Sequence, residues 1–249
     1  MWVWCLFLAI AGILVDLWFI KKEYAQEMFQ ATIFKGIASL FFVVIGFIAY
    51  SKVNDAVKNL VIIGLILGLI GDVFLNMRNL YEGALSNKIF AVGILAFMSG
   101  HFLYIAAMLK VALSYGGVLV ALMITILSTV FLSLISIPPL MRRIIAPSKG
   151  LKIFGYVYLV VVITMYCASA AQLAGLLKQG SRGGMLCYGI FMFIGALFFL
   201  VSDFIMIYYS FGKKIKPLRA INLLTYYLGQ LLIAASGLFF VSSVFQSIS

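Results

Sequence analysis

The chain has 249 residues, of which 65% are hydrophobic and only 10% are charged. A soluble globular chain is roughly 45–50% apolar and about 25% charged, so this composition excludes a soluble domain and indicates a protein embedded in lipid. The formal net charge of +11 does not indicate nucleic-acid binding, because the basic residues lie in short segments between apolar runs, as in loops that set membrane topology. We therefore expect membrane lipids, and no nucleic acid, as partners.

Apolar runs long enough to cross about 30 Å of hydrocarbon predict eight helical spans. No basic residue precedes the first run, and Lys21 and Lys22 follow it, so we predict a retained helix and not a signal peptide. No connection is long enough to hold a soluble domain. The sequence thus predicts a single all-α domain over residues 1–249, a polytopic transmembrane helix bundle. The predicted spans cover residues 2–20, 31–50, 57–76, 88–109, 114–137, 151–177, 184–209 and 219–246.

Basic residues are divided unequally between the two sides of this predicted bundle. Five fall on the side of the two termini and twelve on the other, which the positive-inside rule assigns to the cytoplasm. Both termini are therefore predicted on the non-cytoplasmic side, of a bacterial inner membrane or of the endoplasmic reticulum. The twelve are Lys21, Lys22, Arg78, Lys88, Arg142, Arg143, Lys149, Lys152, Lys213, Lys214, Lys216 and Arg219.

The sequence encodes no recognisable metal or cofactor site. Cys5, Cys167 and Cys187 lie in apolar surroundings without C-x-x-C spacing, which predicts neither a disulfide framework nor a thiolate metal site. His101 is the only histidine, so a three-histidine zinc site cannot be built. We expect no metal and no cofactor.

Asp72 and Asp203 are the most informative residues, because each lies inside an apolar run. Both are predicted roughly 6–10 Å below the cytoplasmic boundary, at a rise of about 1.5 Å per residue, and we expect them to face each other across the bundle. A charge within the bilayer costs at least about 2.5 kcal/mol unless it faces protein or water, so such residues are functional candidates.

Further polar residues are predicted in the same half of the bilayer, and they would form a cavity open to the cytoplasm or the inner leaflet. The alternative is structural: Lys35 would form an ion pair with Asp16 or Asp72, and Asp16 needs no active-site explanation. His101, near the midplane, is equally explained as a packing histidine. The candidates that would accompany the two aspartates are Lys35, His101, Tyr158, Tyr226, Tyr227 and Gln230.

In three predicted spans, glycine or phenylalanine residues spaced four positions apart lead to an ionisable residue. Close packing of helices in lipid favours small residues, so one such ridge would be weak evidence, but the pattern occurs three times. The ridges are Gly64, Gly68 and Asp72, then Gly93, Phe97, His101 and Tyr104, then Gly195, Phe199 and Asp203.

These segments resemble the YhhN-like lysoplasmalogenase family of eight-span membrane proteins, from about residue 30 to 236. The matching stretches are GLILGLIGDVFL at 64–75, FxxGxxxFxxxHxxY at 90–104, GALFFLVSD at 195–203, and LRA at 218–220 followed by TYYxxQ at 225–230. Lys35 matches a family lysine, although Gly36 stands where the family has a proline.

The resemblance implies an ether hydrolase acting on a lysophospholipid substrate. It would cleave the vinyl ether bond of lysoplasmalogens to a fatty aldehyde and glycerophosphoethanolamine or glycerophosphocholine. Two carboxyls suit this chemistry, one protonated as general acid and the other ionised; we predict Asp72 and Asp203 as the catalytic pair. Lys35 would hold one aspartate ionised or bind the phosphate, and His101, Tyr226, Tyr227 and Gln230 would orient groups. Lys216 and Arg219 are candidates for attracting the head group, although topology explains them equally well.

Two other functions stay open. Intramembrane carboxylates with a lysine also occur in proton-coupled small-molecule or lipid transporters, although such proteins often show broken helices and inverted repeats. Neither is visible here, since Pro138, Pro139, Pro147 and Pro217 are all predicted in loops or at span ends. The other possibility is a non-enzymatic lipid-binding or scaffold protein. The oligomeric state is not determined by the sequence.

Overall fold

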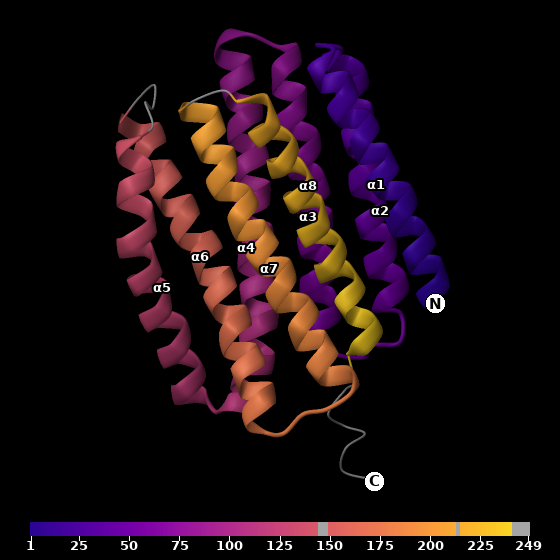
Figure 1. Cartoon of the computed structure of the whole chain (residues 1–249), viewed down its shortest axis with the longest axis vertical. Helices are drawn as coiled ribbons and strands as arrows, with labels where there is room; N and C mark the ends of the chain where they lie inside the picture. Colours follow the sequence, from indigo (N-terminus) through magenta and orange to yellow (C-terminus); the bar gives the residue numbers. More distant parts are fainter. Residues whose placement is uncertain (144–148, 213–214, 241–249) are drawn as a thin grey trace. The chain divides into compact units, whose positions relative to one another are not determined.

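The computed structural model describes residues 1–143, 149–212 and 215–240, and all of their regular secondary structure is helical (Figure 1). Pro147, Lys213, Lys214 and the predicted end of the last span, 241–246, lie outside these residues. The elements in chain order are α1 (Trp2–Tyr24), α2 (Met28–Ala49), α3 (Ala56–Met77), η1 (Arg78–Leu80), α4 (Gly83–Gly116), α5 (Val118–Arg142), α6 (Lys149–Lys178), α7 (Gly184–Phe211), α8 (Lys216–Ala235) and η2 (Ser236–Phe239).

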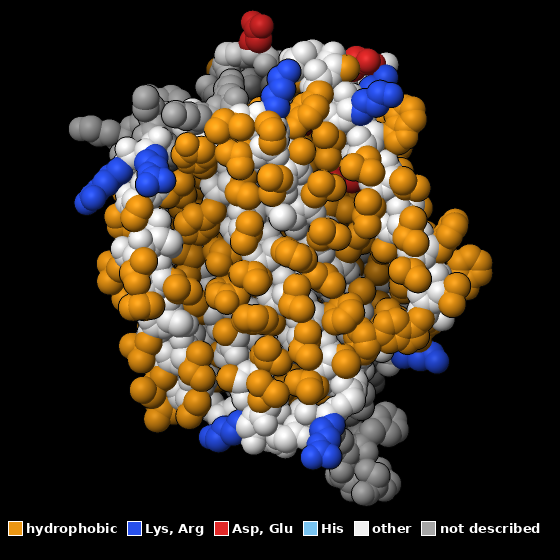
Figure 2. Space-filling view, in the orientation of Figure 1, with side chains coloured by type: hydrophobic (Ala, Val, Ile, Leu, Met, Phe, Trp, Pro, Cys, Tyr) orange, Lys and Arg blue, Asp and Glu red, His pale blue; other side chains and the backbone are white. Residues whose placement is uncertain are grey.

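In the part of the chain that the structure describes, eight helices are long and apolar enough to cross a membrane. Large apolar side chains cover the face seen in Figure 2, while lysines and arginines gather near the helix ends. Leu119 and Leu134 of α5 are 71% and 70% exposed, which is unfavourable in water and suits contact with acyl chains. The all-α prediction is confirmed, and the chain is an integral, multi-pass membrane protein. The non-cytoplasmic location of both termini stays a prediction.

The predicted end of the fifth span is wrong. Pro138 and Pro139 were expected in a loop, but both lie inside α5, which continues to Arg142. Both prolines lie in the last turns of the helix, and each removes the backbone donor that would bond to the carbonyl four residues earlier, of Leu134 or Ile135. Within a membrane the helical backbone is retained through proline because unsatisfied carbonyls cost several kcal/mol in hydrocarbon.

The fourth span is longer than predicted. Helix α4 has 34 residues, which at about 1.5 Å per residue gives roughly 50 Å, well beyond the hydrocarbon thickness of about 30 Å. It ends at Gly116, and Gly117 alone separates it from α5. The φ angle of Gly117 is +82°, a conformation that glycine adopts without the steric cost of a Cβ atom.

The chain forms two compact units. Unit 1 comprises Met1–Tyr104 and the chain from Gln230 onward, and unit 2 comprises Ile105–Gly229. The prediction of one domain over residues 1–249 stays a prediction, and the two units are described in turn.

In unit 1, α2 packs beside α1 and α3, and glycines let α3 and α4 approach closely. A Cβ at Gly64 would lie 2.5 Å from the Tyr104 ring, and one at Gly71 would lie 2.5 Å from the Phe97 ring. The two helices are also close at Gly100 of α4, where a Cβ would lie 3.1 Å from the Gly64 carbonyl oxygen. Gly64 and Gly71 of α3 therefore leave the space that the Tyr104 and Phe97 rings of α4 occupy.

In unit 2, α6 packs beside α5 and α7. The backbones of neighbouring helices come close at two glycines, which have no side chain to hold the helices apart. A Cβ at Gly175 of α6 would lie 2.9 Å from the Gly116 nitrogen, and one at Gly229 of α8 would lie 2.9 Å from the Gly195 carbonyl oxygen. The second contact fixes α8 against α7 two turns before Asp203.

Candidate functional site

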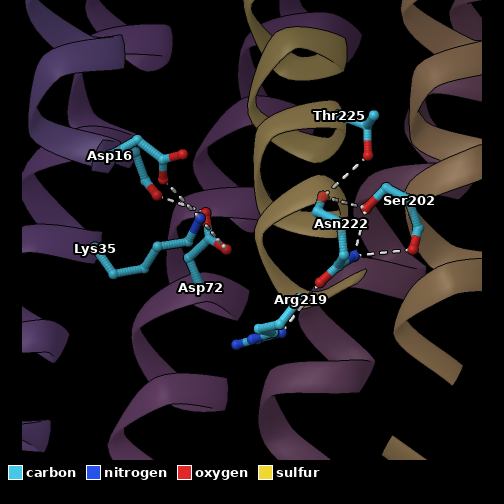
Figure 3. Close-up of polar contacts among 8 residues, drawn as sticks. Asp16, Lys35, Asp72, Ser202, Arg219, Asn222 and Thr225 are labelled. Atoms are coloured by element: carbon cyan, nitrogen blue, oxygen red, sulfur yellow. Dashed lines mark hydrogen bonds and ion pairs between the residues drawn. The ribbon is translucent and has the colours of Figure 1, made fainter. Parts of the chain in front are cut away.

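The first group of candidate residues is a buried cluster in unit 1, here called the Lys35 cluster, formed by Asp16, Lys35, Ser39 and Asp72. Figure 3 shows the Lys35 side chain of α2 reaching between the carboxyls of α1 and α3. Its Nζ lies 3.5 Å from Asp16 Oδ1 and 3.7 Å from Asp72 Oδ1. Ser39, one turn further along α2, donates a hydrogen bond to Asp72 Oδ2.

The Lys35 cluster is withdrawn from solvent. The side chains of Asp16, Lys35 and Asp72 are 0%, 4% and 6% exposed. Removing an ion from water costs several kcal/mol even in a relaxed protein, and a partner of opposite charge repays part of that cost. With all three groups ionised the cluster would hold two negative charges and one positive charge. This composition makes it a place where a proton can be held.

A separate group of polar contacts lies near the end where α2 begins and α3 ends. Asn76, one turn after Asp72, donates to Thr32 Oγ1 over 3.4 Å. Asn79, in the 3₁₀ segment after α3, donates to Asn76 Oδ1 over 3.4 Å. Thr32, Asn76 and Asn79 thus form a hydrogen-bonded group of their own near the end of α3.

Two further sequence candidates of unit 1 lie at separate positions. His101 of α4 is 1% exposed, and its Nδ1 lies 2.7 Å from the Phe97 carbonyl oxygen, one turn earlier. Tyr104 donates a hydrogen bond of 3.0 Å to Gln230 Oε1. Gln230 is therefore held by the aromatic ridge of α4.

In unit 2, Asp203 of α7 accepts a hydrogen bond from Tyr158 of α6. The Tyr158 hydroxyl lies 2.9 Å from Asp203 Oδ2, and the two residues are 5% and 3% exposed. The structure thus brings together two residues that the sequence singled out 45 positions apart. A phenol that donates to a carboxylate favours the ionised form and fixes the orientation of the group.

Beside Asp203 lies a second polar group, here called the Asn222 network, formed by Ser202, Arg219 and Asn222. Asn222 of α8 donates 2.8 Å hydrogen bonds to both the carbonyl and the hydroxyl of Ser202 (Figure 3). Its side-chain oxygen accepts a 3.1 Å bond from Arg219. The guanidinium also lies 5.8 Å from the centre of the Tyr209 ring, so Arg219 is held at the start of α8.

The two remaining tyrosine candidates of α8 are buried in unit 2. Tyr226 is 6% exposed and Tyr227 is 1% exposed. Tyr226 packs edge-on against Phe199, with ring centres 5.2 Å apart. Phe199 lies one turn before Asp203, so this aromatic contact holds α8 against the segment of α7 that carries the carboxyl.

The contacts of the sequence candidates add partners that the sequence did not identify. Ion pairing of Lys35, the structural alternative, is observed with both Asp16 and Asp72. Ser39 and Asn222 were missed, although each could have been noticed as a polar residue one helical turn from a basic residue. Asp72 belongs to unit 1 and Asp203 to unit 2, so their facing each other stays a prediction.

The side chains gathered here are acid–base and hydrogen-bonding groups. Within the described ranges, no group of three or more histidine, cysteine, aspartate or glutamate side chains is placed to hold a metal ion. Cys5 and Cys167 are buried free thiols and Cys187 is a half-buried one. The chemistry that the described contacts support directly is proton transfer by carboxyls whose partners are an ammonium, a hydroxyl and a phenol.

Comparison with known proteins identifies a family. The model of the YhhN family matches residues 30–237, a range that contains Lys35, Ser39, Asp72, Tyr158 and Asp203 and begins after α1. No curated protein and no solved structure matches the chain significantly.

Proposed function

The chain belongs to the YhhN family, and we propose that it is a lysoplasmalogenase-like membrane hydrolase. Its substrate would be an alkenyl lysophospholipid, and its products a fatty aldehyde and glycerophosphoethanolamine or glycerophosphocholine. The family and the membrane-spanning fold support the class of protein. The reaction and its residues are the proposal.

Hydrolysis of a vinyl ether begins with proton transfer to carbon. The proton adds to the alkenyl carbon that does not carry oxygen, and the adjacent carbon becomes part of an oxocarbenium ion. Water then adds to this ion and gives a hemiacetal, which collapses to aldehyde and alcohol. The site must supply a protonated acid, a group that stabilises positive charge, and a base for the water proton.

The observation that carries the proposal is the contrast between two buried carboxyls in membrane-spanning helices. Asp72 lies near an ammonium and accepts a hydroxyl hydrogen bond, whereas Asp203 accepts a hydrogen bond from a phenol. Carboxyls in unlike environments take up unlike protonation states, which is how such pairs divide the roles of acid and base. The pairing of Asp72 with Asp203 in one site is the prediction made from the sequence.

The proposed reaction has three steps. The acid carboxyl gives its proton to the alkenyl carbon, and the oxocarbenium ion forms. A water oxygen bonds to that ion while the second carboxylate accepts a water proton. The carbon–oxygen bond to glycerol then breaks, the second carboxyl protonates the leaving alkoxide, and the hemiacetal hydroxyl proton returns to the first carboxyl.

The other candidate residues would bind and orient the lysophospholipid. We propose Arg219 for the phosphate, because Asn222 holds its guanidinium at the start of α8 and guanidinium matches the geometry of phosphate oxygens. The residues proposed to orient the substrate or the carboxyls are Lys35, His101, Tyr158, Tyr226, Tyr227 and Gln230.

Aldehyde release from an alkenyl lysophospholipid by purified protein in nanodiscs tests the function. We expect Asp72→Asn and Asp203→Asn each to lower kcat by roughly 100- to 10,000-fold, the usual contribution of general acid–base groups. The matched control is Asp55→Asn. Asp55 caps α3 by accepting a 2.8 Å bond from the Val57 amide, and asparagine caps equally well. No release by the unaltered protein would reject the proposal.

A proton-coupled transporter is the second candidate, and the Lys35 cluster is the observation that favours it. Buried carboxyls sharing a lysine can load and release a proton within a membrane. Proteoliposomes with a pH-sensitive dye inside distinguish the two functions. A transporter would acidify the lumen when a transported lysophospholipid is added, and this flux would disappear in Asp72→Asn. A hydrolase would release aldehyde without proton flux.

A further inference from the structure

We propose that Asn222 is a positioning residue: it holds the Arg219 guanidinium in register with Asp203, so that a phosphate bound by Arg219 places the vinyl ether of the same lipid at the Asp203 carboxyl. This inference rests on the proposed function and deepens it, because it makes the head-group phosphate a requirement for efficient cleavage. The residues that carry it all belong to unit 2.

Direct contacts join the guanidinium to the residue beside the carboxyl. Arg219 donates a 3.1 Å hydrogen bond to Asn222 Oδ1, and Asn222 Nδ2 donates 2.8 Å bonds to both the carbonyl and the hydroxyl of Ser202 (Figure 3). Ser202 immediately precedes Asp203 in α7. Adjacent residues of a helix lie about 100° apart around its axis, so Ser202 contacts α8 while Asp203, at nearly the same depth, accepts the Tyr158 hydrogen bond from α6.

The direction of the Asn222 amide is determined by α7. The Ser202 carbonyl can only accept a hydrogen bond, so the Asn222 nitrogen must face it and the oxygen must point away, toward Arg219. The Ser202 hydroxyl completes the contact, since it accepts from that nitrogen and donates over 3.1 Å to the Asn222 backbone carbonyl. Both residues are buried, which strengthens such bonds. The acceptor presented to Arg219 is therefore fixed relative to α7.

The guanidinium is oriented, which a residue that only sets topology does not require. Arg219 is half-buried and is held by the Asn222 hydrogen bond and by the Tyr209 ring, whose centre lies 5.8 Å away. The neighbouring cation, Lys216, is exposed. Topology depends on the number of basic residues near the end of a span, whereas a planar guanidinium must be oriented to bind phosphate oxygens through two parallel N–H bonds.

The relative depths of these residues match the parts of a lysophospholipid. Arg219 lies in the first turn of α8, and Asn222 lies three residues further into the span, about 4.5 Å at 1.5 Å per residue. Because Asn222 bonds beside Asp203, that carboxyl lies about one helical turn deeper than the guanidinium. In the substrate, the glycerol unit separates the phosphate from the vinyl ether and its hydrocarbon chain. A lipid held by its phosphate thus brings its ether to the depth of Asp203.

Binding of this kind affects the rate as well as the affinity. A part of the substrate that does not react can hold the reacting part in place, so a substrate without that part loses kcat. Arg219 would form the hydrogen bonds to phosphate, and Asn222 would act through Arg219 without touching the lipid. Loss of Asn222 is therefore expected to matter chiefly for substrates that carry a phosphate.

A pair of substrates tests this role: an alkenyl lysophospholipid and the alkenyl glycerol that lacks its phosphate. For the unaltered protein in nanodiscs, kcat/KM should be about 10- to 100-fold higher with the phosphate, the contribution of hydrogen bonds to charged groups. Arg219→Lys keeps the charge without the planar fork, and Asn222→Leu removes the amide; each should remove most of this preference. Thr225→Val should keep it and is the control, because the Thr225 hydroxyl donates to the Ile221 carbonyl of the same helix.

The preference separates positioning from a structural role. A variant that is only destabilised loses activity equally with both substrates, so equal losses in Asn222→Leu would overturn the inference. An unchanged preference in Arg219→Lys would also overturn it, because charge alone would then suffice. Adding Asn222→Leu to Arg219→Lys should change the preference little further, as expected for two residues that act together. If Asn222→Leu does not fold, Asn222→Ala gives the same comparison.

Binding without cleavage gives a second readout. A saturated alkyl ether lysophospholipid has no double bond to protonate, and native mass spectrometry can compare its binding with that of the corresponding alkyl glycerol. The unaltered protein should bind the phospholipid about tenfold more tightly or better, and Asn222→Leu should lose this difference. Equal binding by the unaltered protein would overturn the inference. Displacement by an equal concentration of inorganic phosphate would also overturn it, because the site would then bind free phosphate.

The two proposals fail in distinguishable ways. If the unaltered protein releases no aldehyde, the hydrolase function is rejected, and the binding comparison still decides whether Asn222 orients Arg219 for a phosphate-bearing lipid. If aldehyde is released equally well from both substrates, the hydrolase stands and the positioning role is rejected.

Discussion

Lys35 and Asp203 are both ionisable groups in apolar surroundings, and they are accommodated in different ways. Lys35 lies between two carboxyls, so opposite charge offsets its desolvation. Asp203 is bound by the Tyr158 hydroxyl, so a hydrogen bond offsets part of the cost. Truncating a partner in either case leaves a buried group without its compensation, which is more damaging than the modest net strength of the contact suggests.

Tyr158→Phe removes the hydroxyl that donates to Asp203 and keeps the ring. We expect kcat for aldehyde release to fall roughly tenfold, about 1.5 kcal/mol, as for a hydrogen bond to a charged group, with a smaller change in KM. The control is Tyr166→Phe on the same helix, where the ring packs at 5.3 Å from that of Phe193. Equal kcat values for the two variants would show that the Tyr158 hydroxyl does not serve Asp203.

Helices α3 and α4 illustrate how small residues position the site. The aromatic rings of α4 occupy the space that glycines leave on α3, and Asp72 follows the last of these glycines directly. In lipid this close packing replaces the hydrophobic effect as the source of helix association. The placement of Asp72, the proposed catalytic carboxyl, therefore depends on how closely the two helices approach.

Gly64→Ala should destabilise this contact. The new methyl group would lie 2.5 Å from the Tyr104 ring, and Tyr104 cannot move without losing its hydrogen bond to Gln230. We expect a loss of about 1–3 kcal/mol in unfolding free energy, typical of overpacking, measured by denaturant titration in mixed micelles. Gly155→Ala is the control, because its Cβ would meet only Met141 at an ordinary 3.6 Å. A loss no greater than that of the control would contradict the interlocking of α3 and α4.

The helices were predictable from the sequence because apolar length alone identifies a span. The predicted 57–76 and 184–209 nearly coincide with α3 and α7. The ends of α4 were underestimated because a helix can continue beyond the apolar segment. Contacts were harder to predict: helical spacing identifies the face of α2 that carries Lys35 and Ser39, but not the helix that this face meets. That Lys35 lies near both Asp16 and Asp72, and that Asn222 bonds to Ser202, therefore emerged only from tertiary packing.

For the whole molecule, composition indicates a lipid environment and the distribution of loop charge predicts the orientation. The basic residues of one set of connections outnumber those of the other by twelve to five, and such a bias sets topology during insertion. Orientation matters for the proposed function because it decides which leaflet would supply a lysophospholipid substrate. The hydrogen bonds among Thr32, Asn76 and Asn79 lie near the end of α3, which the charge count predicts to be cytoplasmic.

Labelling with a membrane-impermeant maleimide tests this orientation. Replacing Cys5, Cys167 and Cys187, the three cysteines, with alanine gives a background for single cysteines at two exposed loop positions, Lys52 and Glu82. In sealed, inside-out vesicles we expect labelling of Glu82→Cys and protection of Lys52→Cys, because the loop after α3 is predicted to be cytoplasmic and the loop before it is not. Detergent should make both reactive, which verifies that protection reflects the membrane. The reverse pattern would place both termini in the cytoplasm and the end of α3 on the non-cytoplasmic side.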